Sequence, residues 1–397
     1  MARPGTTGRL LAAASALALG ISLSVAPAAS ADEGHHAAVV EVQTYNMDFG
    51  GDLSALFAPG ADLIAATSQI WAETVASNIP ERATAVAGEI AKHQPDLVGL
   101  QEVSTWRTAP AVPTGPTTIV PTGPFVTDYD ALASLLAALK ARGTPYRAVV
   151  VDTTFSNEAF PLPAVTATGL RLVTFTDYNV ILVREKSLHQ GMRVSNAQTH
   201  TYQASLPVSV AGMDIAVTRG WAQVDVRTDG QRFRFIDTHL EAWGVPPMKD
   251  QIRNPQAMEL ASVVGASPYP VVLVGDINSR PTMCTDIPRT DPFEHVLDQN
   301  VVAYGILTDA GLREVWPTLY PRKACAPSGW TSGQLTLQTP QSMLTHRIDD
   351  VFVSSGITPL VARVVGGKTS DRTASGLWPS DHASTWAALL IGHGHDR

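Results

Sequence analysis

Polar side chains stand at the ends of several predicted strands, where carboxylates, carboxamides and imidazoles can together bind a cation or move protons. Asp276 and Asn278 are two residues apart, so in an extended backbone they point to the same side. Asp381 and His382 are adjacent, so we expect them to reach different partners. The strand-end residues are Asn46, Glu102, Asp237, His239, Asp276, Asn278, Asp349, Asp381 and His382.

The oxygen-rich members of this set suit a hard divalent cation. Mg²⁺ prefers oxygen ligands and is held by few protein carboxylates together with water and substrate phosphate. A zinc site would need more His or Cys at close spacing. We therefore expect Mg²⁺, or another divalent cation such as Mn²⁺ or Ca²⁺. Each motif alone is also typical of a turn, a cap or a core residue, so the interpretation depends on the whole set.

Short strand patterns alternate along the chain with helical patterns, and these elements must position the polar residues. Several strands alternate apolar with polar residues, so one face packs and the other is partly wet. We expect an α/β fold with a mixed, largely antiparallel two-sheet core and helices outside it. Strands are predicted at 39–45, 96–100, 179–183, 221–226, 232–236, 270–274 and 350–353, and a helix over 83–90.

Two segments look inserted between these elements. Residues 50–78 are apolar and rich in Ala, which predicts either a helical cap beside the polar residues or a helix that completes the core. Residues 110–123 are rich in Pro, Thr and Gly, which predicts a surface loop.

The composition excludes several classes of protein. Of 397 residues, 45% are apolar and 16% charged, which excludes a disordered chain, and the 30 Gly and 28 Pro follow no period, which excludes a collagen-like one. The net charge of −8 disfavours a general polyanion binder, because phosphate affinity grows with the number of Lys and Arg contacts. A small phosphate-bearing substrate is compatible with this charge.

Residues 1–31 have the pattern of an export signal. Two arginines flank the start of an apolar stretch at 10–25, and Ala29-Ser30-Ala31 forms a cleavage site. A membrane anchor would need about 20 uninterrupted apolar residues, and no later segment is long and apolar enough to span a bilayer. We expect the signal to be removed, the protein to be secreted to the extracellular space, and residues 32–397 to form a single catalytic domain.

Cys284 and Cys325 are the only cysteines of the chain. An oxidising compartment favours a disulfide between them, since neither has another thiol to pair with. The alternatives are two free thiols or part of a metal site, for which two sulfurs alone are too few. We expect one disulfide that restrains the loop following Asn278.

In their order along the chain, the polar motifs resemble those of the endonuclease/exonuclease/phosphatase superfamily of metal-dependent phosphoesterases. That superfamily includes deoxyribonucleases, abasic-site endonucleases, inositol-polyphosphate phosphatases and bacterial neutral sphingomyelinases. The resemblance extends from residue 45 to residue 382. The matching pieces are Tyr45-Asn46, Leu100-Gln101-Glu102, Tyr178-Asn179, Thr238-His239-Leu240, Gly275-Asp276-Ile277-Asn278, His346-Arg347-Ile348-Asp349 and Ser380-Asp381-His382.

This resemblance implies a four-layer α/β sandwich, in which two central, mostly antiparallel mixed sheets are flanked by helices and the site lies at one rim. It implies that Glu102 is the principal metal ligand, with Asn46 and Asp381 nearby. It also implies that Asp276 and Asn278 hold the attacking water and a phosphate oxygen.

The same resemblance implies roles for the remaining polar residues. His239 and His382 would carry positive charge or protons, and Asp349 would orient His382. Asn179 would bond the phosphate. The reaction would be an in-line attack of water on a phosphoester, without a covalent intermediate on the protein.

Two assignments stay open at this point. Either His382 or Asp276 could accept the proton of the attacking water. The family usually has an aromatic residue where this chain has Asp350, so either Asp349 or Asp350 could face His382.

The substrate follows less directly from the residues. Export, the acidic balance and aromatic residues such as Trp243 and Trp330 favour a phospholipase C or sphingomyelinase-like diesterase that acts on phospholipid head groups at a membrane or micelle surface. The apolar segment 50–78 favours the same substrate. An extracellular nuclease would favour Lys and Arg along a groove, and only scattered ones are present. A soluble phosphate monoesterase is a third candidate.

A non-enzymatic secreted binding module is the alternative to an enzyme. It would be expected to lack one of the catalytic side chains, but Glu102, His239, Asp276 and His382 are all present. We therefore expect a phosphoric diester hydrolase that acts as a monomer.

Overall fold

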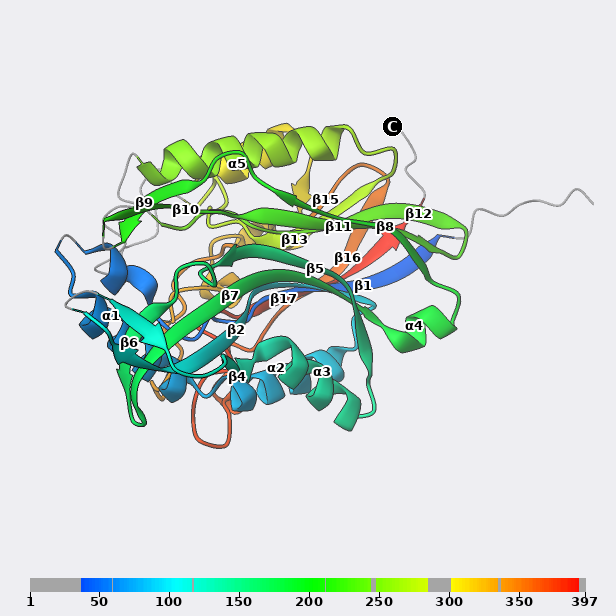
Figure 1. Cartoon of the computed structure of the whole chain (residues 1–397). Coiled ribbons are helices and arrows are strands. Elements are labelled where there is room, and N and C mark those ends of the chain that lie inside the picture. Colours follow the sequence, from blue (N-terminus) through cyan, green and yellow to red (C-terminus); the bar gives the residue numbers. More distant parts are fainter. Residues whose placement is uncertain are drawn as a thin grey trace, which may run out of the picture. The chain divides into compact units, whose positions relative to one another are not determined.

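Two β-sheets pack face to face at the centre of the fold, and helices lie outside them (Figure 1). The computed structural model describes residues 37–58, 60–115, 118–210, 212–243, 248–284, 301–334 and 337–392. The predicted export signal and its cleavage site lie outside the described residues and stay predictions. Among the helices of the described part, none has the length and apolar character that a membrane crossing requires.

The first sheet has nine strands, with β16, β17, β1, β2, β7 and β5 as neighbours in that order. β1 and β2 run parallel, and the other strand pairs described in this sheet are antiparallel. The strands are β1 (Ala38–Asn46), β2 (Leu97–Pro113), β3 (Ile119–Pro121), β4 (Val126–Asp130), β5 (Tyr146–Ser156), β6 (Leu162–Thr166), β7 (Gly169–Arg184), β16 (Ile357–Val365) and β17 (Ser384–Ile391).

The second sheet has six strands, in the order β14, β15, β13, β12, β11 and β8. β12 and β13 run parallel, while the remaining pairs are antiparallel. The predicted mixed, mostly antiparallel sheets are therefore confirmed. The strands are β8 (Arg193–Thr201), β11 (Gly220–Thr228), β12 (Gln231–His239), β13 (Val271–Asp276), β14 (Arg313–Glu314) and β15 (Asp349–Val353).

Helices form the two outer layers. On the first sheet, α2 (Ile79–His93) and α3 (Ala131–Ala141) pack in one apolar cluster with β2 and β7, and α1 (Leu63–Ser77) joins the same cluster beside β6. On the second sheet, α5 (Met248–Gly265) and α6 (Val302–Asp309) pack against β13 and β15. Figure 1 shows α2 and α3 on one side of the sheets and α5 on the other. This is the predicted four-layer α/β sandwich.

The core between the sheets follows from strand alternation. In β1, Val40 and Val42 are fully buried and belong to the same apolar cluster as Val272 and Val274 of β13. Because successive side chains of a strand point to opposite faces, β1 also supplies Tyr45 to the cluster that faces the helices. Because β1 and β13 are packed in the core, their last residues, Asn46 and Asp276, have fixed positions.

The predicted surface loop at 110–123 is wrong in part. β2 continues to Pro113 and pairs with β3, with Val112 opposite Val120 and Ala111 opposite Pro121. Pro, Thr and Gly dominate the composition of this segment, but β-branched residues between them, such as Val112 and Val120, have a high preference for strands and pair with each other. The segment 50–78 forms the short 3₁₀ helix η1 (Leu53–Phe57) and helix α1, so it contributes to the core through Ile70 and to a cavity through η1.

The predicted disulfide is confirmed. Cys284 and Cys325 are bonded, with their Cα atoms 5.3 Å apart. The bond joins the segment that leaves β13 to the segment that follows α7 (Val315–Leu319).

Candidate active site

The register of the second sheet brings three predicted residues into one row. His239 at the end of β12 lies opposite Asp276 at the end of the parallel strand β13. Asp276 in turn lies opposite Asp349 at the start of the antiparallel strand β15. Because β15 runs the other way, its first residue meets the last residues of its neighbours at the same edge of the sheet. Residues far apart in the sequence are thus neighbours here.

Asp276 lies at the middle of this row. Its Oδ2 atom accepts a hydrogen bond of 3.1 Å from Nδ2 of Asn46, which comes from the other sheet. Its Oδ1 atom accepts one of 3.0 Å from the backbone amide of Asn278. Burial and the neighbouring charge of Asp349 raise the pKa of Asp276 to about 7, against an opposing effect of His382. Asp276 can therefore exchange a proton near neutral pH.

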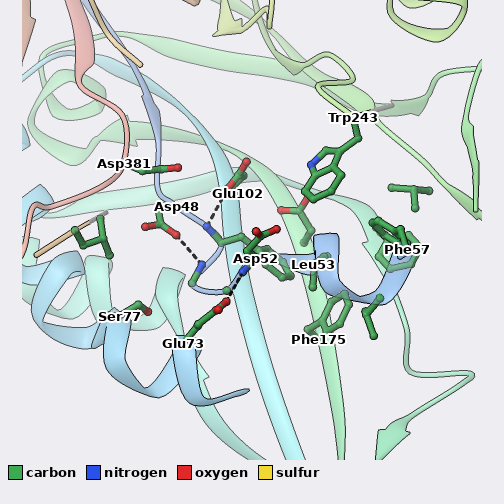
Figure 2. A pocket seen from close by; sticks show the side chains of 18 of the residues that line it. Asp48, Asp52, Leu53, Phe57, Glu73, Ser77, Glu102, Phe175, Trp243 and Asp381 are labelled. Atoms are coloured by element: carbon green, nitrogen blue, oxygen red, sulfur yellow. Dashed lines mark hydrogen bonds between the residues drawn. The ribbon is translucent and has the colours of Figure 1, made fainter. Parts of the chain in front are cut away.

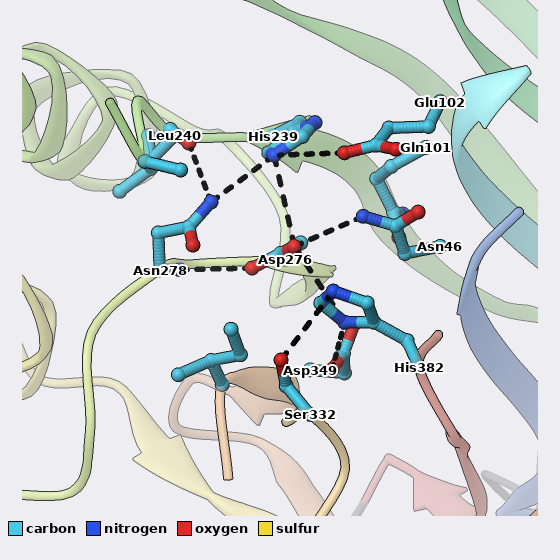
Figure 3. Close-up of polar contacts among 12 residues, drawn as sticks. Asn46, Gln101, Glu102, His239, Leu240, Asp276, Asn278, Ser332, Asp349 and His382 are labelled. Atoms are coloured by element: carbon cyan, nitrogen blue, oxygen red, sulfur yellow. Dashed lines mark hydrogen bonds and ion pairs between the residues drawn. The ribbon is translucent and has the colours of Figure 1, made fainter. Parts of the chain in front are cut away.

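Asn278 reaches the row by a turn and not by an extended backbone. β13 ends at Asp276, and Asn278 has a φ of 50°, so the expectation that strand geometry aligns the two side chains is wrong. The turn places Nδ2 of Asn278 2.9 Å from the carbonyl oxygen of Leu240 and 3.1 Å from Nε2 of His239. His239 Nε2 also lies 3.6 Å from Oδ2 of Asp276, so all three side chains still meet (Figure 3).

His382 lies against Asp349. Its Nδ1 atom is 2.8 Å from Oδ2 of Asp349, and its Nε2 atom is 3.4 Å from the hydroxyl of Ser332 (Figure 3). Burial lowers the pKa of His382, but the carboxylates of Asp349, Asp381 and Asp276 outweigh it and raise this pKa well above its usual value. The imidazole is thus oriented through Nδ1, with Nε2 pointing away from Asp349.

Asp350 faces the opposite side of β15. Its Oδ1 atom lies 3.0 Å from Nε of Arg347, which also bonds Glu314 at 2.6 Å. Adjacent residues of a strand point to opposite faces, so Asp349 and Asp350 cannot share a partner. Of the two acids left open by the sequence, Asp349 is the one that contacts His382, while its catalytic role stays a prediction.

Glu102 is aimed by an irregularity in β2. The pairing of β2 with β7 shifts register between Leu100 and Val103, and Glu102 has a φ of 55°. Bulges of this kind redirect a side chain out of the regular pleat. The Oε2 atom of Glu102 accepts a hydrogen bond of 2.8 Å from the amide of Phe49, and its Oε1 atom lies 4.0 Å from Nε2 of His239.

Asn46 and Asp381 are the other two predicted metal ligands. Oδ1 of Asn46 accepts a hydrogen bond of 3.0 Å from the amide of Asp48, which fixes the orientation of its carboxamide. Burial, followed by the charges of Asp48 and Glu102 against that of His382, raises the pKa of Asp381 to about 8. Several acids are therefore crowded together in one place.

The crowded acids fit a divalent cation. Asp276, Asp349 and His382 offer ligand atoms that all lie within 4.8 Å of one another. Glu102 and Asp381 line the adjoining cavity, and both interact electrostatically with neighbouring carboxylates. A cation relieves this repulsion, and a donor set dominated by oxygen suits a hard ion. The structure thus holds residues that could bind a divalent metal, and the assignment of Mg²⁺ to Glu102, Asn46 and Asp381 stays a prediction.

Arg219 contacts the site, although the sequence indicated it only as one of several scattered basic residues and not as a candidate site residue. Its Nη1 atom lies 3.2 Å from Nδ1 of His239 and 3.4 Å from Oδ2 of Asp177, and its Nε atom lies 3.5 Å from Oε2 of Glu241. Burial, Arg219 and His382 lower the pKa of His239 well below its usual value. This shift disfavours a positive charge on His239, while its expected role in catalysis stays a prediction. The one signal in the sequence was the position of Arg219 directly before β11.

Asn179 is buried within β7, in the first sheet. Its Nδ2 atom donates a hydrogen bond of 3.0 Å to the carbonyl oxygen of Gly220, directly after Arg219. This contact links Asn179 to the strand end that carries Arg219. Its predicted bond to the phosphate stays a prediction.

A cavity of about 750 Å³ opens beside the polar residues. Figure 2 shows Asp48 and Asp381 at one end and Phe57 and Trp243 at the other. Six acidic residues and one arginine line the cavity: Asp48, Asp52, Glu73, Glu102, Asp177, Asp381 and Arg219. Half-buried apolar side chains also line the cavity, and we name six of them the apolar wall: Leu53, Phe57, Val208, Ile215, Val217 and Trp243.

Comparison with known proteins agrees with this geometry. The sequence model of the Endonuclease/Exonuclease/phosphatase family matches residues 44–382. Among curated protein sequences, none matches this chain.

Three solved structures are similar to this chain. A family protein from Bacteroides thetaiotaomicron has 15% identity and a TM-score of 0.51, over 91% of this chain and 99% of that one. One from Bacteroides vulgatus has 15% identity and a TM-score of 0.50, over 89% and 99%. A mannosyl-6-phosphatase from Bacteroides thetaiotaomicron has 15% identity and a TM-score of 0.49, over 89% and 100%. The matched family model spans the strand ends that form the site, and the chain belongs to the endonuclease/exonuclease/phosphatase family of phosphoester hydrolases.

Proposed function

We propose that this chain is a divalent-metal-dependent phosphodiesterase that cleaves phospholipids at the head group. The observation that carries the proposal is the chain of contacts from Glu102 through His239 and Asp276 to His382, beside a cavity that is acidic at one end and apolar at the other. The polar residues support phosphoester hydrolysis, and the character of the cavity supports the choice of substrate.

The side chains support a reaction by direct attack of water. Asp349 holds His382 through Nδ1, so Nε2 is the atom that exchanges a proton with the reacting groups. Asp276, with a pKa of about 7, is the second candidate for the base. Arg219 can only donate, so Nδ1 of neutral His239 accepts and its Nε2 carries the hydrogen, which can be donated to a phosphoryl oxygen as negative charge grows there. A divalent cation held by Glu102, Asn46 and Asp381 would supply further neutralisation of that charge.

The charges of the cavity favour a lipid over a nucleic acid. Six acidic residues and one arginine line it, and the acids outnumber the arginine even though the raised pKa of Asp381, about 8, leaves that residue mostly protonated at neutral pH. A nucleic acid would need Lys and Arg along its backbone, because its affinity depends on phosphate contacts. A phospholipid presents one phosphodiester, frequently next to an ammonium group, and its other substituents are apolar. We propose that the enzyme acts as a monomer at a membrane or micelle surface.

Export is part of the same proposal. The disulfide between Cys284 and Cys325 is compatible with an extracellular protein, because such bonds persist in oxidising compartments. N-terminal sequencing of protein recovered from culture medium tests it. A mature chain that begins at Asp32 supports export, and retention of residues 1–31 in the cell contradicts it.

The activity test compares several phosphoesters at one Mg²⁺ concentration, each with and without EDTA. We expect hydrolysis of bis-4-nitrophenyl phosphate, and faster hydrolysis of phosphatidylcholine, phosphatidylethanolamine or sphingomyelin than of plasmid DNA or 4-nitrophenyl phosphate. Glu102→Gln serves as the inactive control. Preferred cleavage of DNA would point to a nuclease, and preferred cleavage of the monoester to a phosphatase. A protein inactive on every ester would be a binding module.

A further inference from the structure

A separate two-stranded sheet closes one side of the cavity. It consists of β9 (Leu206–Val210) and β10 (Met213–Val217), which run antiparallel. Val208 lies opposite Ile215, and Leu206 lies opposite Val217. All four side chains line the cavity, because alternate residues of a strand share one face.

The other face of this small sheet is different in character. Pro207 and Ser209 of β9, and Asp214 and Ala216 of β10, are exposed. The sheet is therefore amphipathic, with its apolar face toward the cavity. A two-stranded sheet is marginally stable by itself, so packing of this face against the η1 region helps to hold it in place.

The apolar wall is not completely covered by the protein. Val208, Ile215 and Val217 remain partly exposed within the cavity, as do Leu53 and Phe57 of η1. The ring of Phe57 meets Trp243 edge to face, with centroids 5.5 Å apart. Three separate parts of the chain thus present apolar surface to one space. Apolar surface exposed in a concave site is the usual lining of a pocket for an apolar ligand.

The apolar wall is continuous with the catalytic end. The same cavity is lined by Glu102, Asp381 and Arg219, which belong to the polar site or contact it. Its volume of about 750 Å³ is within the range of pockets that enclose a whole small ligand, and a phosphate group alone fills only a small part of it. A phosphoester whose phosphate lies at the polar end of the cavity therefore has space for one substituent beside the wall.

We propose that the apolar wall binds a hydrocarbon chain of the substrate, and that it selects phosphoesters with an aliphatic substituent over those without one. The proposal rests on the phosphodiesterase function proposed above and names the part of the substrate that this chain recognises. Affinity then increases with chain length by about fourfold for each methylene group that the wall buries.

The test is direct binding of a homologous series to the Mg²⁺-loaded full-length protein. Methyl, butyl, hexyl and octyl phosphate share one phosphate group and differ only in their chains. Isothermal titration calorimetry below the micellar concentration of each gives Kd without relying on turnover. We expect Kd to decrease by at least about tenfold from methyl to octyl phosphate. A Kd independent of chain length would overturn the proposal.

Three variants locate the binding surface. Ile215→Asp places a charge on the wall and should abolish the dependence on chain length. Val208→Trp keeps the wall apolar but fills the space, so octyl phosphate should lose affinity while methyl phosphate keeps it. Ser209→Asp is the matched control, because it places the same charge on the exposed face of the same small sheet. We expect this variant to bind the whole series as the original protein does.

The outcomes separate this proposal from the proposed function. If bis-4-nitrophenyl phosphate is hydrolysed with Mg²⁺ but Kd does not vary with chain length, the wall proposal fails and the phosphodiesterase stands. If binding follows chain length but no diester is hydrolysed, the phosphodiesterase fails. Thermal melting shows whether Ile215→Asp has unfolded; in that case the series with the original protein and Val208→Trp decide. An unchanged series in Val208→Trp contradicts the proposal.

Discussion

Replacement of Asp349 by Asn tests the pairing on which the reaction depends. The Nδ1 atom of His382 lies 2.8 Å from Oδ2 of Asp349 in a buried setting. At an effective dielectric constant of about 20, opposite unit charges at this separation attract by about 6 kcal/mol. Because about 1.4 kcal/mol corresponds to tenfold in rate, this bounds the loss in kcat at about 10⁴-fold.

The direction of the pH effect follows from the same contact. Asp349 is the largest of the charges that raise the pKa of His382 against its burial. If neutral His382 is the base, activity increases with pH through that raised pKa. Asp349→Asn lowers the pKa, so the acid limb of the pH–kcat profile should move to lower pH. KM should change little, because Asp349 is fully buried and does not line the cavity.

The neighbouring acid provides the matched control. Asp350→Asn makes the same chemical change one residue away, but Asp350 contacts Arg347 and not His382. We expect kcat and its pH profile to stay as they are, whatever the effect on stability. Steady-state kinetics of Asp349→Asn, His382→Ala and the double variant complete the test. The double variant should be hardly slower than His382→Ala, because the two residues act as one unit. Fully additive losses, or a large effect of Asp350→Asn, would refute the reasoning.

Three further predictions concern the metal, the disulfide and a buried acid. Glu102→Gln removes a metal-binding charge at constant size, so we expect a loss of orders of magnitude in kcat/KM that is partly recovered at high Mg²⁺; full activity after EDTA treatment would contradict the metal. Replacing Cys284 and Cys325 by Ala opens a loop of 41 residues and should lower the free energy of unfolding by about 4 kcal/mol in chemical denaturation, with an unchanged midpoint as the contrary result. Burial and the charge of Asp371 raise the pKa of Glu89 to about 8, so the folded state keeps a proton that the unfolded chain loses above its ordinary value of 4.5. Stability should therefore fall as pH rises from about 4.5 to 8, and Glu89→Gln should remove that fall in thermal melts; an identical slope in this variant would show that Glu89 does not cause it.

Much of the fold could be predicted because it depends on local pattern. Alternating apolar residues predicted β1, β12 and β13, and helical spacing predicted α2, since both periods follow from backbone geometry. The lengths of β2 and β7 could not be predicted in this way. Both strands extend past their apolar segments, because pairing with each other and with edge strands stabilises residues that have weak strand preference alone.

The choice between Asp349 and Asp350 shows where the local pattern ends. Both are acids at the start of one strand, and only the resemblance to the superfamily favours Asp349 over Asp350. The pairing of β15 with β13 places Asp349 beside Asp276 and His382, whereas Asp350 points to the other face and contacts Arg347. Only the folded sheet therefore decides which acid reaches His382. Arg219 was missed for the same reason, since its link to His239 joins strands that are neighbours only in the folded sheet.

The sequence by itself determined the types of polar side chain at the candidate site, their order, the two-sheet core and the pairing of the two cysteines. These follow from residue chemistry, from short-range periodicity and from the presence of two cysteines alone. The tertiary structure decided which side chains meet, that burial and Arg219 lower the pKa of His239, and that the acidic site continues into an apolar wall. Those properties depend on contacts between segments that are far apart in the sequence, such as η1, the β9–β10 sheet and Trp243. Burial and electrostatic interaction depend on the distance between side chains in the folded protein and not on their separation along the chain.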